Sequence, residues 1–408
     1  MRSVGLFSVC ISIALFSACT DEGEGDVTGG SPPLTGGSPP TSGGNGGEAT
    51  GGGGAGVGGA GGSGGEAPLA CMNIAPDFFT VEGDDLCVVQ TFTAEGLELL
   101  SYGTTPTWGA HGGPLTSSVN TANTSLTLTR WSKSGTTLTK ADTTVALTGV
   151  PADAFFGGLA LESDATGAAC ADDQVVSVAW SGGNFTTEGA IVTVTPAGDA
   201  ESVTATGVFG MASIGASVFY TGLSEVAGPT NAVVGLYAAE TASCDAGLAT
   251  SGAIETGWGL ATGPVARDLD GNIFAILTDY LTGRQLIHGY RAADLTAGGA
   301  LDGVELADLE GFGDAFAAVP PEGDEPGLLV LQPNAGDLTE NQDVVAVEYS
   351  SAGGTLASGL TKTLLTISEE DKNVTLMTDD EGHLWVGVTT PGETPVTTFY
   401  VMARRPAD

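Results

Sequence analysis

Four glycines recur at a nearly constant distance, and each leads into a short apolar run. Gly215 precedes ASVFY, Gly271 precedes NIFAIL, Gly327 precedes LLVLQ and Gly382 precedes HLWVGV. Successive members of this series are 56, 56 and 55 residues apart. Self-similarity at a fixed period indicates one supersecondary unit stacked on copies of itself. This periodicity constrains the fold of the chain more than its composition does.

A second kind of run keeps a constant phase against these glycines. It is an apolar segment rich in valine, threonine and leucine, which ends in an aromatic residue and is followed by a polar turn. Such runs predict β-strands, and no long segment sustains a helical period, so we predict an all-β fold. The copies end at Phe92, Trp131, Trp180, Tyr237, Tyr290, Tyr349 and Tyr400, with spacings between 39 and 59 residues.

A repeat of about 50–57 residues with roughly four short strands resembles a β-propeller blade. The phrases DLDGNIFAIL and DDEGHLWVGV, which begin at Asp268 and Asp379, resemble the acidic-glycine turn between the first two strands of blades in many bacterial propellers. The resemblance implies six or seven four-stranded blades over residues 71–408. It also implies that a strand near Val88 completes the last blade, and that middle strands are apolar on both faces. Two or three tandem β-sandwich domains are the alternative fold.

The start of the chain has the features of an export signal. After a basic residue at position 2, residues 4–18 are mostly apolar and too few to span a membrane as a helix, which needs about 20. The sequence Phe16-Ser17-Ala18-Cys19 resembles the lipobox of bacterial lipoproteins, although that family usually has leucine where Phe16 stands. The resemblance implies a signal peptide over residues 1–19, a lipid on Cys19, and anchoring in the cell envelope, at the outer membrane or cell surface. The alternative is an ordinary secreted protein that is cleaved near Ala18.

Residues 20–70 are predicted to form a disordered tether. Of the 45 residues between Glu22 and Glu66, 21 are glycine, and none is basic or aromatic. Such a segment cannot bury enough apolar surface to offset the entropy lost on ordering. As a glycine-rich coil it would reach about 35–40 Å.

The charge balance is strongly acidic. The chain has 49 acidic and 11 basic residues, for a formal net charge of −38. A surface of this kind repels nucleic acid, so nucleic acid is not an expected partner. It keeps an exported protein soluble and attracts cations weakly.

Four cysteines follow the signal and the predicted lipid site, and an even number in an exported protein predicts two disulfides. Sequence alone allows three connectivities. We favour the pair that would clip the N-terminal segment onto the domain, and the second pair follows by elimination. A zinc site is not expected, since there is no CxxC pair. The two pairs are Cys71–Cys87 and Cys170–Cys244.

Three groups of side chains are candidates for a metal-binding or catalytic site. Asp268, Asp270 and Asn272 resemble part of a calcium loop, but a hairpin turn explains the same letters. We therefore expect no cofactor, with calcium as the weaker alternative. The acidic runs at 369–371 and 379–381 are predicted to be solvated surface. No residue is assigned a catalytic, cofactor-binding or metal-binding role, and the three histidines are expected to be structural: His111, His288 and His383.

The five tryptophans could form a platform for stacking sugars. Three belong to the repeated strands and are predicted to lie in the core: Trp131, Trp180 and Trp385. Trp108 and Trp258 lie in glycine-rich segments and are the better candidates for exposure. His111-Gly112-Gly113 resembles the oxyanion loop of some esterases, but there is no G-x-S-x-G nucleophile elbow to accompany it.

These features predict a surface-anchored lipoprotein with a propeller head that acts as a non-enzymatic binding, adhesion or scaffold module. Its partners would be the membrane, through the lipid, and a protein or glycan at the cell surface. The alternative is an extracytoplasmic lyase or hydrolase that acts on a polymer in the central funnel. Facing carboxylates with a histidine or arginine near the funnel would favour the enzyme, whereas an aromatic or acidic rim would favour binding.

Overall fold

A computed structural model describes residues 70–405, with gaps at 73–77, 98–105, 110, 121, 152–153, 162–175, 182–188, 195–199, 206–207, 215–216, 224–231, 240–247, 256–263, 280–283, 297–302, 311, 335–340, 369–372, 391 and 393. The chain divides into two units, Met1–Ser63 and Gly64–Asp408. The first unit lies outside the described residues. The described residues all belong to the second unit.

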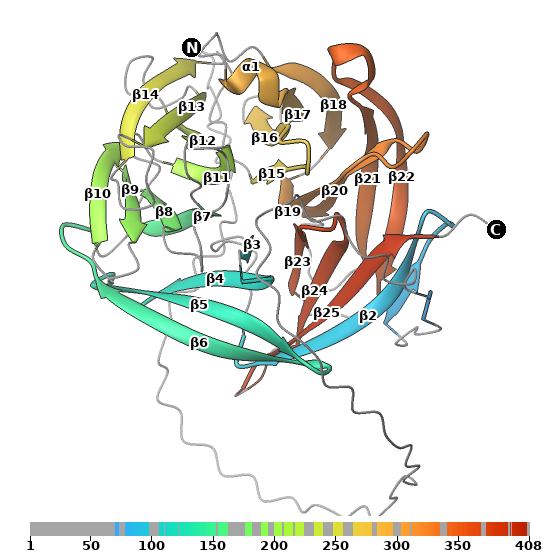
Figure 1. Cartoon of the computed structure of the whole chain (residues 1–408), viewed down its shortest axis with the longest axis horizontal. Coiled ribbons are helices and arrows are strands. Elements are labelled where there is room, and N and C mark those ends of the chain that lie inside the picture. Colours follow the sequence, from blue (N-terminus) through green and yellow to red (C-terminus); the bar gives the residue numbers. More distant parts are fainter. Residues whose placement is uncertain are drawn as a thin grey trace, which may run out of the picture. The chain divides into compact units, whose positions relative to one another are not determined.

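Within the described residues, the strands form six four-stranded antiparallel sheets, here called blades 1 to 6 (Figure 1). Blade 1 contains β3 (Thr107–Gly109), β4 (Gly113–Val119), β5 (Ser125–Ser134) and β6 (Thr137–Ala146). Blade 2 contains β7 (Phe155–Leu161), β8 (Val176–Ser181), β9 (Gly189–Val194) and β10 (Ala200–Ala205). Blade 3 contains β11 (Val208–Ile214), β12 (Ser217–Leu223), β13 (Ala232–Ala239) and β14 (Leu248–Glu255).

The second half of the chain repeats this order. Blade 4 contains β15 (Val265–Arg267), β16 (Ile273–Asp279), β17 (Arg284–Tyr290) and β18 (Val304–Glu310). Blade 5 contains β19 (Phe312–Val319), β20 (Gly327–Asn334), β21 (Gln342–Ser350) and β22 (Ala357–Ile367). Blade 6 contains β23 (Asn373–Thr378), β24 (Leu384–Thr390), β25 (Val396–Arg404) and β2 (Leu86–Glu95).

The first strands of the six blades form a closed cycle. Each contacts the first strands of its two neighbours, in the order β3, β7, β11, β15, β19, β23 and back to β3. Figure 1 shows the six sheets arranged around the axis that these strands surround. This arrangement is a β-propeller, and it replaces the alternative of tandem sandwiches, in which sheets would pack in pairs.

The N-terminal strands close the ring, as predicted. β2 is the outer strand of blade 6, where it pairs with β25 from the end of the chain. β1 (Phe79–Val81) adds a fifth strand to blade 5 by pairing with β22. A single parallel pair, Thr93 with Thr137, joins the outer strands of blades 6 and 1 into one eight-stranded sheet. The start of the chain therefore holds three consecutive blades together.

Two of the predicted turn glycines, Gly271 and Gly382, lie in turns between the first and second strands of their blades. Gly271 and Gly382 have φ angles of +82° and +86°, which glycine adopts without the steric cost that a side chain would bring. Gly327 begins the second strand of blade 5, and β12 begins shortly after Gly215 in blade 3. The 56-residue period therefore follows the second strands of blades 3 to 6.

The aromatic-ended strands do not all occupy the same position, and this settles the blade number. Those ending at Trp131, Tyr237, Tyr290, Tyr349 and Tyr400 are third strands, whereas Trp180 lies on a second strand and Phe92 on the closing strand. Since Phe92 and Tyr400 belong to the same blade, the seven repeats correspond to six blades among the described residues. The possibility of seven is wrong.

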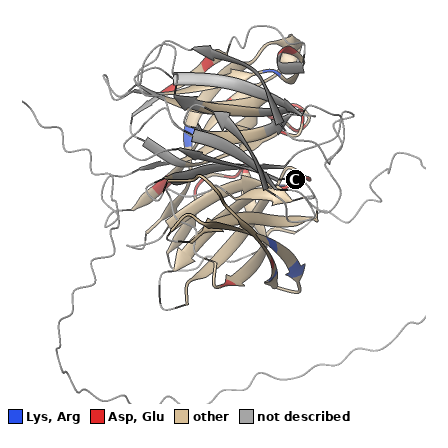
Figure 2. Ribbon diagram, turned by 90° about the vertical axis from the view of Figure 1, so that its left-hand side faces the viewer, with Lys and Arg blue, Asp and Glu red and all other residues tan. Residues whose placement is uncertain are grey.

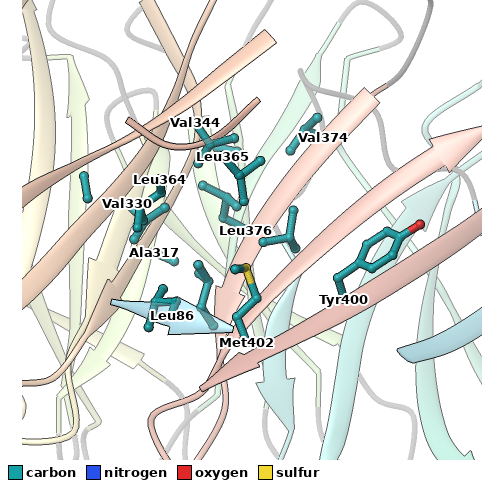
Figure 3. Close-up of a cluster of buried hydrophobic side chains, with 14 of the residues drawn as sticks. Leu86, Ala317, Val330, Val344, Leu364, Leu365, Val374, Leu376, Tyr400 and Met402 are labelled. Carbon is teal, nitrogen blue, oxygen red and sulfur yellow. The ribbon is translucent and has the colours of Figure 1, made fainter. Parts of the chain in front are cut away.

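The core lies between the faces of neighbouring blades. In Figure 3, side chains from blade 5 meet side chains from blade 6 and from the closing strand. Second strands are apolar on both faces, as β24 shows, where Leu384, Trp385 and Val386 are all fully buried. Burial of each such side chain contributes about 1.5–3 kcal/mol to the stability of the folded state. The residues that meet in Figure 3 include Leu86, Ala317, Val330, Val344, Leu376 and Met402.

Little of the described chain is helical. It contains the five-residue α1 (Ala292–Thr296) and the 3-10 turn η3 (Ala352–Gly354). Neither of these described helices has the length or the apolar content to cross a bilayer. Basic residues are sparse along the described ribbon, as the charge colouring in Figure 2 shows.

Candidate functional site

The turn from β15 to β16 is held by a buried carboxylate. Asp268 Oδ1 accepts a hydrogen bond from the backbone N–H of Asn272 (2.8 Å), and Oδ2 accepts one from the Asn272 side chain (2.8 Å). The Tyr349 hydroxyl donates a third, to Oδ2 (2.9 Å). Burial raises the pKa of Asp268, although these hydrogen bonds oppose the shift.

This geometry is that of a hairpin turn. The Asp268 N–H donates to Asn272 O (3.1 Å), and the Gly271 N–H donates to Asp268 O (3.1 Å). Both Asp268 oxygens point to protein donors, while Asp270 is exposed. Among the described residues, no group of three or more His, Cys, Asp or Glu could hold a metal ion. The calcium alternative is not tested by these contacts.

The turn from β23 to β24 repeats the same device. Asp379 Oδ1 accepts hydrogen bonds from the backbone N–H groups of Glu381 (3.0 Å) and His383 (2.8 Å). Its Oδ2 accepts one from the indole of Trp385 (3.0 Å). Asp380 and Glu381 are exposed, as predicted, but the prediction of a solvated Asp379 is wrong. Its carboxylate is buried because it supplies the acceptors that the turn requires.

His383 lies between two carboxylates. Its Nδ1 is 3.1 Å from Asp379 Oδ2 and 3.4 Å from Glu381 Oε2. The hydrogen bond to Asp379 raises the pKa of His383, against the effects of burial and of nearby Lys133. Burial works against ionisation of Asp379, but hydrogen bonds from His383 and Trp385 outweigh it and lower the pKa of Asp379.

Next to this turn, the ammonium of Lys133 lies close to three aromatic rings. Lys133 Nζ lies 5.1 Å from the ring centroid of Trp108, 5.3 Å from that of Trp385 and 5.7 Å from that of Phe92. All three distances are within the range of cation–π attraction. We call Phe92, Trp108 and Trp385 the aromatic cage.

The cage is assembled from two blades. Phe92 on β2 and Trp385 on β24 belong to blade 6, and their rings are stacked with centroids 5.2 Å apart. Trp108 on β3 and Lys133 on β5 belong to blade 1, and the Trp108 ring is tilted against Trp385 at 4.8 Å. Trp385 is fully buried, Trp108 is half-buried and Lys133 is exposed. One wall of the cage therefore borders solvent.

The structure describes the side chains of three of the five tryptophans. Trp131 and Trp385 lie in the core, as predicted, and the Trp131 indole donates to Thr116 Oγ1 (3.1 Å). Trp108 is only partly exposed, because it packs against Trp385. Trp180 lies on β8, of which only the backbone is described, and Trp258 lies outside the described residues.

The other two histidines are separate from the cage. His111 Nε2 is hydrogen-bonded to the backbone oxygen of Trp131 (3.1 Å), which gives the His-Gly-Gly phrase a role in the β3–β4 turn. His288 is buried on β17, and burial lowers its pKa although Glu305 opposes the shift.

One of the two predicted disulfides lies within the described residues. Cys71 and Cys87 are bonded, as predicted. Cys87 is on β2, so the bond fastens the segment around Cys71 to the outer strand of blade 6. Cys170 and Cys244 lie outside the described residues, as do Cys19 and the acidic run at 369–371.

A shallow groove of about 210 Å³ lies between blades 4 and 5. The side chains of Val304 and Leu356 border it, and Arg291 forms a paired hydrogen bond with Asp294 at its rim. The Arg291 guanidinium is already paired with Asp294, so it is not free to bind a ligand in the groove. The groove is therefore a weaker candidate binding site than the cage.

Sequence reasoning did not single out Lys133 or Phe92 as site residues. Alternation along β5 places Lys133 on the same face of the strand as Trp131, two positions earlier, and this was the available signal. No pattern in the sequence relates position 92 to positions 108 and 385. They meet because the N-terminal strand closes the ring.

No protein-family model and no curated protein sequence matches the chain. Among solved structures, it is similar to an α-L-arabinanase from Penicillium chrysogenum (12% identity, TM-score 0.41, 79% of this chain and 96% of that chain). It is also similar to hydrazine synthase from Kuenenia stuttgartiensis (14%, 0.42, 72% and 77%) and to a lectin from Aleuria aurantia (8%, 0.36, 78% and 95%). These likenesses assign neither a family nor an activity. The described residues form a six-bladed propeller, as their own strand order and inner-strand contacts show.

Proposed function

We propose that this protein is a tethered, non-enzymatic binding module, anchored to the cell envelope through a lipid on Cys19. Its propeller head would bind a protein or glycan, and the aromatic cage would be the binding site. The single observation that carries the proposal is the half-buried Trp108, which presents an aromatic surface beside the fully buried Trp385. Aromatic rings fixed in this way offer a large contact area at little entropic cost.

The charge of the chain favours cationic over anionic partners. The whole chain has a formal net charge of −38, so it attracts cations and repels polyanions at long range. The acidic groups next to the cage have structural partners: Asp379 accepts hydrogen bonds from its own turn and from Trp385. Its carboxylate holds the cage in place.

The extracytoplasmic enzyme is the second candidate, and one observation favours it. His383 lies between Asp379 and Glu381, which is the grouping of a histidine with carboxylates that a catalytic site would need. Two of these three side chains, however, are committed to the β23–β24 turn. Binding therefore remains the better-supported function.

The binding proposal is tested by screening the protein against a glycan and peptide array, with a Trp108→Ala variant as the matched control. We expect a ligand that the parent binds and the variant does not, with unchanged circular dichroism. Equal binding by both would overturn the assignment of the site. Release of soluble fragments from a polymer, lost in His383→Ala, would establish the enzyme instead.

The anchor is tested separately. A Cys19→Ser variant should move from the membrane fraction to the soluble fraction, because the lipid would have no attachment site. Retention in the membrane fraction would refute the lipid anchor. Neither outcome affects the assignment of the cage.

A further inference from the structure

The aromatic cage holds an ammonium group that belongs to the chain itself. The Lys133 ammonium is held over the rings of all three cage residues. Among the described residues, no carboxylate lies within ion-pair distance of it, in contrast to Lys362, which pairs with Asp85 and Glu348. The cation lies within cation–π range of three rings, and proteins recognise ammonium ligands with aromatic rings in this way.

The walls of the cage do not depend on Lys133 for their positions. Trp385 is fixed by its hydrogen bond to Asp379 (3.0 Å) and by an edge contact with Phe399. Phe92 stacks on Trp385, and both belong to the hydrophobic cluster between blades 6 and 1. The rings should therefore keep their places when the lysine leaves.

Lys133 itself can leave at little cost. It is exposed, and it lies near the end of β5 on a flexible four-carbon stem. Cation–π attraction at an exposed site contributes about 0.5–1 kcal/mol, so water competes well for the ammonium group. A quaternary ammonium group loses less hydration than a lysine when it enters an aromatic site.

From these contacts we propose that the cage is a binding site for quaternary ammonium groups, in which Lys133 acts as an exchangeable internal occupant. The acidic head would concentrate such cations near the site. The inference rests on the proposed function, since it specifies the ligand of the same site. The proposed ligand group is trimethylammonium.

The test is a titration of the full chain with choline, in which binding is measured by tryptophan fluorescence and by calorimetry. The neutral isostere 3,3-dimethylbutan-1-ol is the matched ligand control, because it has the same shape without the charge. Lys133→Ser should bind choline about three- to sixfold more tightly than the parent, since the competing ammonium is gone. Lys140→Ser, which removes an exposed lysine on neighbouring β6, should bind like the parent.

A second measurement does not depend on any variant. The ε-methylene protons of Lys133 should be shifted upfield by the ring currents in the parent protein. Added choline should move them toward the ordinary lysine position, while the neutral alcohol should not. Unchanged Lys133 signals at saturating choline would overturn the exchange.

The outcomes separate this inference from the proposed function. Equal choline binding by the parent and Lys133→Ser, or equal binding of the neutral alcohol, refutes the ammonium site. If a ligand found on the array still requires Trp108 in that case, the binding module stands with another ligand. If Trp108→Ala changes neither experiment, both proposals fail.

Discussion

The hydroxyl of Tyr349 on β21 donates a hydrogen bond of 2.9 Å to the carboxylate of Asp268, which lies 81 positions earlier in the chain. The bond joins the third strand of blade 5 to the first turn of blade 4. Tyr290 occupies the same strand position in blade 4. Each of the two rings lies against a glycine, Gly327 for Tyr349 and Gly303 for Tyr290. The buried hydroxyl of Tyr290, however, has no hydrogen-bond partner among the described residues.

The two tyrosines should therefore respond in opposite ways to the loss of the hydroxyl. Tyr349→Phe leaves a buried carboxylate oxygen with one donor fewer and should lower the free energy of unfolding by about 1.5–3 kcal/mol. Tyr290→Phe removes a buried hydroxyl that has no partner among the described residues, and it should be neutral or stabilising by up to about 1 kcal/mol. Urea denaturation of both variants measures the difference. Equal destabilisation would contradict the assigned role of Tyr349.

The disulfide should stabilise the ring closure. Cys71 and Cys87 are separated by 16 positions, and the segment between them contains β1, which pairs with blade 5. A loop of this length predicts about 3 kcal/mol of stabilisation through the unfolded chain. The double variant Cys71→Ser/Cys87→Ser should lose that amount in urea denaturation.

The control is the parent protein under reducing conditions, which should behave like the double variant if this bond dominates. An unchanged midpoint in the variant would show that β1 and β2 dock without the bond. The pair Cys170–Cys244 stays a prediction. Mass spectrometry of the unreduced chain should find no free thiol among the last four cysteines.

Calcium should have little effect on stability. Both oxygens of the Asp268 carboxylate accept hydrogen bonds from protein donors, so binding a cation there would break contacts that hold the turn. Melting curves in calcium and in a chelator should coincide. A higher melting temperature in calcium, lost in Asp268→Asn, would instead establish a calcium loop.

Substitution of Gly382 should be more costly than its backbone angle alone explains. A Cβ at this position would lie 2.9 Å from Pro320 Cγ, whereas one at Gly135 would meet nothing within 4 Å. Both glycines have positive φ angles, so both alanine variants pay roughly 1–2 kcal/mol for the left-handed backbone. Overpacking should add about 1–3 kcal/mol at Gly382.

The comparison of Gly382→Ala with Gly135→Ala isolates the packing effect. We expect Gly382→Ala to lower the free energy of unfolding more than Gly135→Ala does, because only the Cβ at position 382 meets a close neighbour. Equal losses would mean that the turns of blades 5 and 6 can move apart freely.

The parts of the fold that were predictable are those that the chain encodes locally. The turns at Gly271 and Gly382 require a positive φ, and the second strands after them are apolar on both faces, so both left a period in the sequence. The ring closure by β2 followed from the same repeat. The blade number was ambiguous because Trp180 and Phe92 occupy strand positions that differ from the other aromatic residues.

The cage was not predictable for a different reason. Phe92, Trp108 and Trp385 come from three strands of two blades, and ring closure is what brings the ends of the domain together. The burial of Asp379 was also missed, since DDEG reads as a polar turn. Its first aspartate accepts hydrogen bonds from the turn, while the next two acids face solvent.

His383 and His288 should titrate in a definite order. His383 is hydrogen-bonded to Asp379, which raises its pKa above the ordinary value of about 6.5, while burial lowers the pKa of His288. In an NMR titration, His383 should therefore lose its proton at a higher pH than His288. The His288 signal serves as the internal control.

The raised pKa of His383 also makes the stability of the protein depend on pH. Since the folded pKa of His383 lies above its unfolded value, its contribution is fully present below about pH 6.5 and is lost as the pH rises through the folded pKa. Asp379 has a lowered pKa, so its contribution is present above about pH 3.9 and is lost as the pH falls through its folded value. Asp379→Asn should return the pKa of His383 toward 6.5 and flatten the loss of stability on the alkaline side. A His383 pKa that does not respond to Asp379→Asn would show that Glu381 dominates the shift instead.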